Sequence, residues 1–318
     1  MVNRQSAPAS SSTAVLYVGT SGYPYPEWVE AGFYPPGTSQ RQMLAWYAER
    51  FSCAELNYTW YQMPKAEAVE RQRRQAPARF LFAAKLTRTL THEANENWRA
   101  QAAQYRDGIA PLLQARQLAA VLLQWPASFD RSMAHRRYLA ALLDELSGLP
   151  LAVEFRHESW AHDRVFAELE RRKVTLVTVD APRLQGLFPT LAIVTHPAQF
   201  YVRFHGRNAA GWRSGQLQSQ FDYLYSEAEL RERIEQTIEP LAGKTRRGLL
   251  FFNNHVRAQA PKNAQTLIRL LLEKGLQTSG SPSKNPSPCP LPPRGAGDRQ
   301  PLFRGAAGDR SSSEEDAS

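Results

Sequence analysis

Short runs of apolar residues recur along the chain, and most of them end in polar side chains. The clearest run covers residues 151–160, LAVEFRHESW, which begins like a buried strand and then continues into Glu154, Arg156 and His157. A carboxylate and a guanidinium at buried positions are costly unless they pair or meet a ligand. This pattern therefore predicts a strand that delivers charged side chains to a pocket.

The same design recurs, so the pattern predicts eight strands separated by helices. The strands are expected at residues 15–18, 53–58, 80–84, 119–123, within 151–160, and at 174–179, 200–204 and 248–252. Helical spacing of apolar residues is found at 40–50, 66–74, 98–113, 135–146, 163–173, 226–241 and in a last helix that ends near Lys274. Strands joined by helices lie parallel. Eight such units over about 260 residues predict a single TIM-like (β/α)8 barrel, with ligands at the C-terminal ends of the strands.

The two ends of the chain differ in composition from this barrel, which is expected to cover residues 14–275. Residues 1–13 are rich in Ser and Ala, and residues 276–318 are rich in Pro, Gly, Ser and Arg, with GAGDR and GAAGDR repeated. Such segments lack the apolar residues needed for a core. Both are therefore predicted to be disordered.

Composition points to a protein of the cytoplasm. The 318 residues are 42% hydrophobic, which is ample for a core. The two cysteines, Cys53 and Cys289, imply no disulfide framework, and a reducing compartment is the default. No apolar stretch is long enough to cross a membrane, and the N-terminal residues lack the apolar segment of a signal peptide. A membrane partner is therefore not expected, and nothing in the sequence indicates the oligomeric state.

The formal charge is +9, and the segment from Gln277 onward is neutral, so nearly all of the excess lies on the predicted barrel. A basic protein favours anionic partners, either nucleic acid or phosphorylated and carboxylated small molecules. Charge alone does not choose between them.

Polar residues at the predicted strand ends form the candidate site. The candidate catalytic residues are Glu154, His205, Asp180 and Lys85, and the candidate substrate-binding residues are Glu55, Asn57, Gln124, Arg156, Arg203, Arg207 and Asn253. Several of them are assigned to the site because side chains alternate between the two faces of a strand. On this basis Glu55, Asn57 and Thr59 are expected on one face of their strand, and the same holds for Tyr201, Arg203, His205 and Arg207.

The chemistry of these groups suits acid–base catalysis on an anion. The planar forks of Arg156 and Arg203 fit a carboxylate or a phosphate. His205 is expected to titrate near neutrality, with Glu154 or Asp180 as its carboxylate counterpart. The alternative is that Glu154, Arg156 and Arg203 form a structural ion-pair network that fills the barrel.

A metal site is a weaker hypothesis, and no cofactor is identified. Glu154, His157, Asp180 and His205 could together bind a divalent ion. Their spacing matches no dedicated metal motif, however, and the nearby arginines would repel a cation. The predicted site therefore contains no metal ligand.

Two classes of function follow, and a third stays open. The density of ionisable groups favours an enzyme that acts on a small anionic or sugar-like substrate. The charge, and aromatic residues expected on the surface such as Trp28, Trp212 and Tyr225, favour a protein that binds or processes nucleic acid. No recognised nucleic-acid motif is present. A non-catalytic ligand-binding barrel is the third class.

A set of motifs, in order along the chain, carries a resemblance to a known family. The motifs are GTSGY with a following FYP, AELNYTWY, FLFAAKLT with THE, LLQWPASF, VEFRHESW, VTVD, YVRFHGR and FFNNH. With these motifs, residues 15–272 resemble the YecE-like family, domain of unknown function 72. Tyr23 departs from the family pattern, which usually has tryptophan there, but an aromatic ring is kept. The resemblance implies a TIM-like barrel, and it implies no particular activity because fold does not determine function.

Overall fold

Eight parallel strands form the centre of the molecule, in a computed structural model that describes residues 14–280. The strands are β1 (Val15–Thr20), β2 (Cys53–Leu56), β3 (Leu81–Lys85), β4 (Leu118–Gln124), β5 (Leu151–Glu154), β6 (Thr175–Asp180), β7 (Phe200–Phe204) and β8 (Arg247–Phe252). Their order in the sheet is β1-β8-β7-β6-β5-β4-β3-β2, and every neighbouring pair is parallel. The two end strands are therefore consecutive in the chain, as in a barrel.

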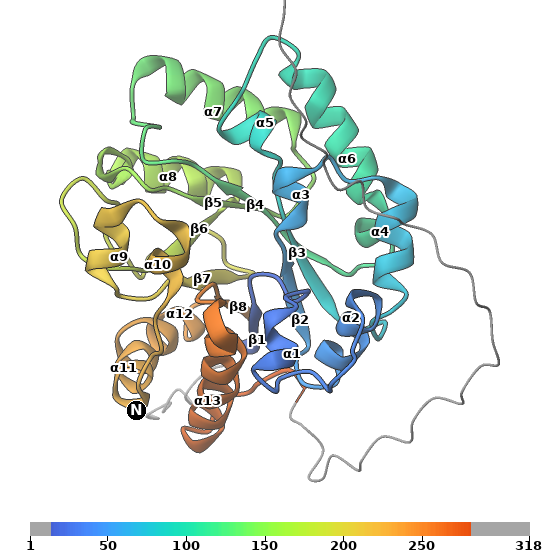
Figure 1. Ribbon diagram of the computed structural model, residues 1–318. Coiled ribbons are helices and arrows are strands. Elements are labelled where there is room, and N and C mark those ends of the chain that lie inside the picture. Colours follow the sequence, from blue (N-terminus) through green and yellow to red (C-terminus); the bar gives the residue numbers. More distant parts are fainter. Residues whose placement is uncertain (1–13, 281–318) are drawn as a thin grey trace, which may run out of the picture. The chain divides into compact units, whose positions relative to one another are not determined.

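Helices surround these strands (Figure 1). They are α1 (Glu27–Glu30), α2 (Gln40–Ala48), α3 (Tyr58–Tyr61), α4 (Ala66–Arg73), α5 (Arg88–Thr91), α6 (Trp98–Gln114), α7 (Met133–Glu145), α8 (Asp163–Arg172), α9 (Ala209–Ser214), α10 (Leu217–Phe221), α11 (Glu227–Arg233), α12 (Glu239–Ala242) and α13 (Gln259–Glu273). Short 3-10 turns cover Glu158–Trp160 and Val256–Ala258, and a π-helical turn covers Ile234–Ile238.

The barrel closes between β1 and β2 through a narrow seam. Ser21 and Glu55 form a single bridge there, and the Gly22 amide donates to the Glu55 carbonyl at 2.8 Å. Gly19 makes this approach possible, because a Cβ at this position would lie 2.2 Å from the Cys53 carbonyl oxygen. The glycine-rich turn thus brings the ends of two strands together at the same rim.

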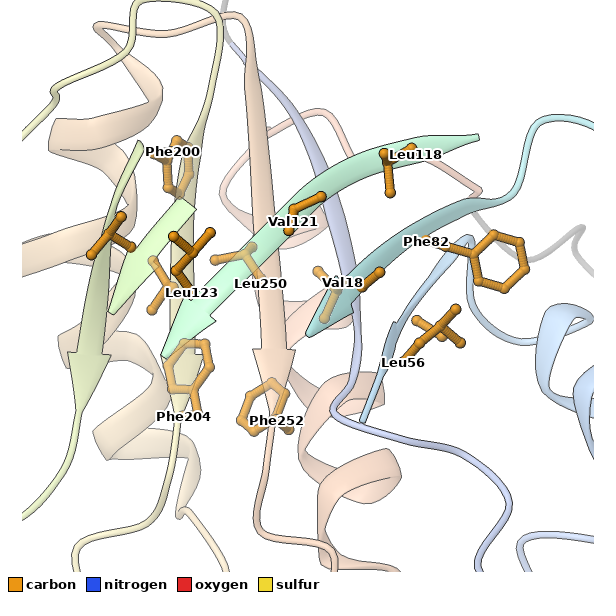
Figure 2. Close-up of a cluster of buried hydrophobic side chains, with 14 of the residues drawn as sticks. Val18, Leu56, Phe82, Leu118, Val121, Leu123, Phe200, Phe204, Leu250 and Phe252 are labelled. Carbon is orange, nitrogen blue, oxygen red and sulfur yellow. The ribbon is translucent and has the colours of Figure 1, made fainter. Parts of the chain in front are cut away.

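The strands have an outer face and an inner face of different character. Large apolar side chains on the outer face pack under the helices; Figure 2 shows several of them, including Val121, Phe204 and Phe252. The inner face carries a smaller apolar cluster that includes Ala83, Ala152 and Leu249. Side chains alternate between the two faces along each strand. Polar residues that follow the inner apolar layer are therefore directed to the mouth of the barrel.

The predicted barrel is confirmed, and most strand bounds agree within two residues. The second strand ends two residues earlier than predicted: β2 stops at Leu56, and Tyr58–Tyr61 forms α3. Thr59 is therefore not on the inner row with Glu55. Its hydroxyl instead donates to the Leu56 and Lys85 carbonyls.

The barrel domain also continues past its predicted end at residue 275. Leu16 donates its amide to the Gln277 carbonyl at 2.8 Å, and Ser279 donates back to Leu16 at 2.8 Å. The predicted disordered segments are 1–13 and 276–318, and all of these residues except 276–280 lie outside the described part of the chain. Within residues 14–280, no helix is both long and apolar enough to span a membrane.

Candidate active site at the mouth of the barrel

A cavity of about 760 Å³ opens at the C-terminal ends of the strands. Its lining combines aromatic rings, amides and cations: Tyr25, Asn57, Trp60, Tyr61, Lys85, His92, Gln124, Pro126, Ala127, Arg156, Leu187, Arg203, Trp212, Gln218, Gln220, Phe221, Asn253 and His255. No aspartate or glutamate is among these lining residues. The wall that a ligand would meet is therefore positive and aromatic.

Arg203 forms ion pairs that link three strands at the floor of this cavity. From β7, its Nη2 donates to Glu55 Oε1 on β2 at 2.7 Å, and its Nη1 donates to Glu154 Oε2 on β5 at 2.7 Å. Tyr201, which precedes Arg203 on the same face of β7, donates its hydroxyl to the other oxygen of Glu55. Arg203 is 2% exposed and both carboxylates are fully buried. The floor is thus a dry, hydrogen-bonded ion-pair cluster.

Arg156 extends this cluster to the wall of the cavity. Its Nε donates to Glu154 Oε1 at 2.6 Å, and its guanidinium lies 5.1 Å from the ring centroid of Trp212. We call Glu55, Glu154, Arg156 and Arg203 the inner network. Burial opposes the charge on Glu154, but Arg203 and Arg156 outweigh it and hold the pKa of this carboxyl well below its usual range. Glu154 is therefore a permanent anion that orients two arginines.

His205 lies beneath the cavity rather than on its wall. It is fully buried, with Nε2 at 3.0 Å from Arg156 Nη2 and Nδ1 at 3.0 Å from the Asn253 amide nitrogen. Both ring nitrogens therefore lie beside donor groups. Burial, and next the charge of Arg156, lower the pKa of His205 to about 3. The prediction that His205 titrates near neutrality is wrong, because burial and the charge of Arg156 outweigh Glu154, whose Oε1 lies 3.4 Å from Nε2.

Lys85 is a cavity residue whose pKa is lowered toward neutrality. It ends β3 and places its ammonium 4.7 Å from the ring centroid of Trp60. No carboxylate of the described residues lies within 4.0 Å of it. Burial, and next the charge of Arg203, lower the pKa of Lys85 to about 7.

His92 is a neighbour of Lys85 that the sequence did not assign to the site. Its Nδ1 accepts from Trp60 Nε1 at 3.4 Å and lies 2.9 Å from the Thr91 hydroxyl. Burial, and next the charge of Lys85, lower the pKa of His92 to about 4. Its position directly after α5, a short distance past the end of β3, gave the only signal that could have placed it here.

Asp180 and Arg207 are directed away from the cavity, contrary to the prediction. Asp180 pairs in register with Phe204, which belongs to the outer face, whereas its neighbour Val179 pairs with the inward Arg203. Arg207 leaves the alternation of β7 because Gly206 adopts a positive φ of +87°.

These two residues belong to a separate cluster behind the sheet. Arg207 donates to both oxygens of Asp180 at 2.9 Å, and Arg233 and the Tyr225 hydroxyl approach the same carboxylate at 3.3 and 2.9 Å. Glu232 accepts from both arginines. We call Asp180, Arg207, Glu232 and Arg233 the outer network.

The remaining predicted residues divide into cavity wall and floor. Asn57, Gln124, Arg156, Arg203 and Asn253 line the cavity together with Lys85. Glu55, Glu154 and His205 lie behind this wall and hold it. The four residues considered as metal ligands are not gathered: His157 caps the turn at Ser159, and Asp180 faces outward. Within residues 14–280 no three His, Cys, Asp or Glu side chains are placed to hold a metal ion.

Aromatic residues on the loops were the main omission. Trp60 and Tyr61 come from α3, and Trp212 and Phe221 come from the segment after β7. The alternation of residues along a strand, which indicates the side that a side chain faces, gives no information about them because they lie outside the strands. Two aromatics that were expected on the surface are instead buried, Trp28 at 0% and Tyr225 at 3% exposure.

This geometry occurs in a chain that has recognisable relatives. The family described as "Protein of unknown function DUF72" matches residues 17–288. The chain belongs to the DUF72 family. The chain is 25% identical to the UPF0759 protein YunF of Bacillus subtilis over 272 residues, which cover 81% of this chain and 95% of YunF. It is 32% identical to the UPF0759 protein YecE of Escherichia coli K12 over 148 residues, about half of each chain (45% and 49%).

Solved structures of DUF72 proteins are similar to this fold. A DUF72 family protein of Thermotoga maritima matches with a TM-score of 0.73 and 33% identity, covering 81% of this chain and 99% of that one. One from Enterococcus faecalis matches with a TM-score of 0.72 and 24% identity, over 81% and 96% of the two chains, and supports the fold alone. The names of these relatives assign no substrate, so the site must be interpreted from its own residues.

Proposed function

We propose that this DUF72 barrel is an enzyme that acts on a small anionic molecule, phosphorylated or carboxylated, in the cavity at the mouth of the barrel. The observation that carries the proposal is the charge of the wall. Lys85, Arg156 and Arg203 line the cavity, and no carboxylate does. Glu55 and Glu154, buried behind the wall, pair with Arg156 and Arg203. Lys85 has no such partner, and its charge is therefore available to an anionic ligand.

Two donors in the cavity region support the same proposal. Arg203 Nε is buried and has no hydrogen-bond partner among the described residues. Arg156 uses Nε and Nη2 on Glu154 and His205, and its Nη1 donates to no described residue. A buried donor without a partner is costly, and an anionic oxygen would satisfy it. Such unused capacity is typical of a binding site.

The aromatic rings favour a compact ligand over a polymer. Trp60, Trp212 and Phe221 surround the cations and reduce the water around them, which strengthens each charge interaction. The nucleic-acid alternative relied on surface aromatics, but Trp28 and Tyr225 are buried, and Trp212 lies in the cavity. A small molecule with one anionic group and an apolar or sugar-like body fits this lining better.

Melting curves with matched charged and neutral ligands test the proposal. Glucose 6-phosphate and glucose form one pair, and citrate and glycerol form another. We expect the anions to raise the melting temperature of the wild type, since a ligand at 100 times its Kd adds about 2.7 kcal/mol of stability. The neutral partners should give a much smaller shift. Lys85→Gln should reduce the anion-dependent shift without abolishing it, because Lys85 adds positive charge to the cavity while Arg156 keeps its free donor.

The control is Lys262→Gln, because Lys262 is exposed on α13 and lies outside the cavity. This variant should respond as the wild type does. Equal anion shifts in Lys85→Gln and the wild type would refute the cavity as the site. A short single-stranded oligonucleotide that binds both lysine variants alike would place any nucleic-acid contact elsewhere.

A further inference from the structure

Lys85 differs from every other lysine that the structure describes. The other five are exposed: Lys65, Lys173, Lys244, Lys262 and Lys274. Lys85 is half-buried, lines the cavity and faces the ring of Trp60. Its ammonium has no hydrogen bond and no carboxylate partner among residues 14–280, although its backbone is firmly held. The Thr59 and Tyr105 hydroxyls both donate to the Lys85 carbonyl oxygen, at 2.6 and 3.1 Å.

A structural lysine in this position would be expected to have a carboxylate beside it. Glu55 and Glu154 are close at hand, but Arg203 and Arg156 occupy them. The lysine is instead left next to two cations and an aromatic ring. Removal of an amine from water beside other cations is the arrangement that favours its neutral, nucleophilic form. The lowered pKa, about 7, agrees with this geometry.

Resting on the proposed function, we propose that Lys85 is a nucleophilic amine that forms an imine with the carbonyl group of an anionic aldehyde or ketone. The phosphate or carboxylate of that substrate would bind at the free Nη1 donor of Arg156, and its carbonyl carbon would face Nζ of Lys85. This assignment names both the substrate class and the residue that attacks it.

The covalent step is balanced by the loss of water. The lone pair of neutral Nζ forms an N–C bond to the carbonyl carbon, and the π electrons move to the carbonyl oxygen. A proton then passes from nitrogen to that oxygen, which gives a carbinolamine. The C–O bond breaks, the oxygen takes a further proton and departs as water, and the remaining N–H proton is released as the C=N bond forms. Protonation of the imine makes it an electron sink for a bond to the adjacent carbon.

Reductive trapping tests this inference with two anionic carbonyl probes. Pyridoxal 5'-phosphate is an aldehyde with a phosphate, and pyruvate is a ketone with a carboxylate. Each is mixed with the full chain, reduced with sodium borohydride, and located by peptide mass mapping. At neutral pH we expect Lys85 to be labelled at least about tenfold more than any exposed lysine, because an ordinary lysine amine is almost fully protonated there. Labelling of Lys85 should rise through a midpoint near pH 7.

Lys85→Arg separates this inference from the proposed function, because arginine keeps the positive charge but forms no such imine. It should lose the label and keep the rise in melting temperature that the probe anions cause; Lys262→Arg is the matched control and should keep both. If the probes raise the melting temperature but leave Lys85 unlabelled, the imine is excluded and the anion site stands. Labelling of exposed lysines at the level of Lys85 would also exclude it. If neither labelling nor a shift occurs, both proposals fail.

Discussion

The inner and outer networks use the same residue types at the same end of the barrel, yet they differ in whether a nearby cation is left without a carboxylate partner. In the inner network, Glu55 and Glu154 face Arg156 and Arg203, and the nearby Lys85 adds a cation with no partner. In the outer network, Arg207 and Arg233 face Asp180 and Glu232, and Glu229 lies 3.5 Å from Arg207 as a further carboxylate. Each cation of the outer network therefore has a carboxylate partner, whereas the inner cluster has an unpaired cation beside it that calls for an anionic ligand.

The difference arises from the direction of the side chains and not from their chemistry. Val179 and Asp180 are adjacent in β6, but the first faces the barrel interior and the second faces the helices. Behind the sheet, Asp180 meets arginines from the segment after β7 and from α11. A charged residue at a strand end is therefore a candidate for function only when its parity places it inside the barrel.

The largest effect is expected from removal of the arginine at the centre of the inner network. Arg203→Met leaves two fully buried carboxylates, one of them with no other cation, and should cost about 3–5 kcal/mol of unfolding free energy. Urea unfolding at neutral pH measures it. Arg207→Met is the matched control: its side chain is 24% exposed and Asp180 keeps Arg233, so the loss should be clearly smaller. Equal losses would contradict the distinction between the networks.

A smaller effect separates stability from binding. Asp180→Asn removes the charge that Arg207 and Arg233 share, and should cost about 1–3 kcal/mol because hydrogen bonds to charged groups are lost. It should leave the anion-dependent rise in melting temperature unchanged. Lys85→Gln should do the reverse. A loss of ligand response in Asp180→Asn that exceeds its loss of stability would show that the outer network serves the site.

The fold could be predicted from the sequence because it depends on periodicity. Strands such as 200–204 alternate strictly, and the helices between them have a 3.6-residue repeat, so the number and order of the elements followed. The ends of the elements were harder. At residues 57–59 the alternation continues in the sequence, but the Thr59 hydroxyl donates to the Leu56 and Lys85 carbonyls and the chain forms α3.

The site was predictable only in part, because its chemistry depends on neighbours that are distant in the sequence. Lys85, Arg156 and Arg203 were found from their places at strand ends. The low pKa of His205 depends on Arg156, 49 residues away, and could not be read from its own strand. Trp212 reaches the cavity from the short helix α9 after β7, where the alternation of a strand gives no indication of direction.

Lys85, which has no carboxylate partner among the described residues, should make the unfolding free energy depend on pH. The pKa of Lys85 is about 7 in the folded protein and about 10.4 when unfolded, so between these values the unfolded chain binds more protons. Stability from this group therefore rises with pH over that window. Lys85→Met removes this pH-dependent contribution. The stability of the variant relative to the wild type should therefore be greatest near pH 7 and decline with rising pH by about 1.4 kcal/mol per pH unit at most. Urea unfolding between neutral pH and pH 9 measures it, with Lys262→Met as the control that shows no such trend.

The smallest effect is expected at the exposed edge of the outer network, where a matched pair of variants isolates burial from hydrogen bonding. Glu232 and Glu55 each accept one hydrogen bond on each carboxylate oxygen from neighbouring side chains. They differ in exposure, which is 40% for the Glu232 side chain and zero for Glu55.

Glu232→Gln should therefore change the unfolding free energy by less than about 1 kcal/mol, because water already screens its charge. Glu55→Gln should cost about 3 kcal/mol, since Arg203 then keeps one buried partner instead of two. Added salt should shrink the first effect and leave the second nearly unchanged. Similar losses for both variants would mean that the number of hydrogen bonds, and not burial, sets the strength of the two networks.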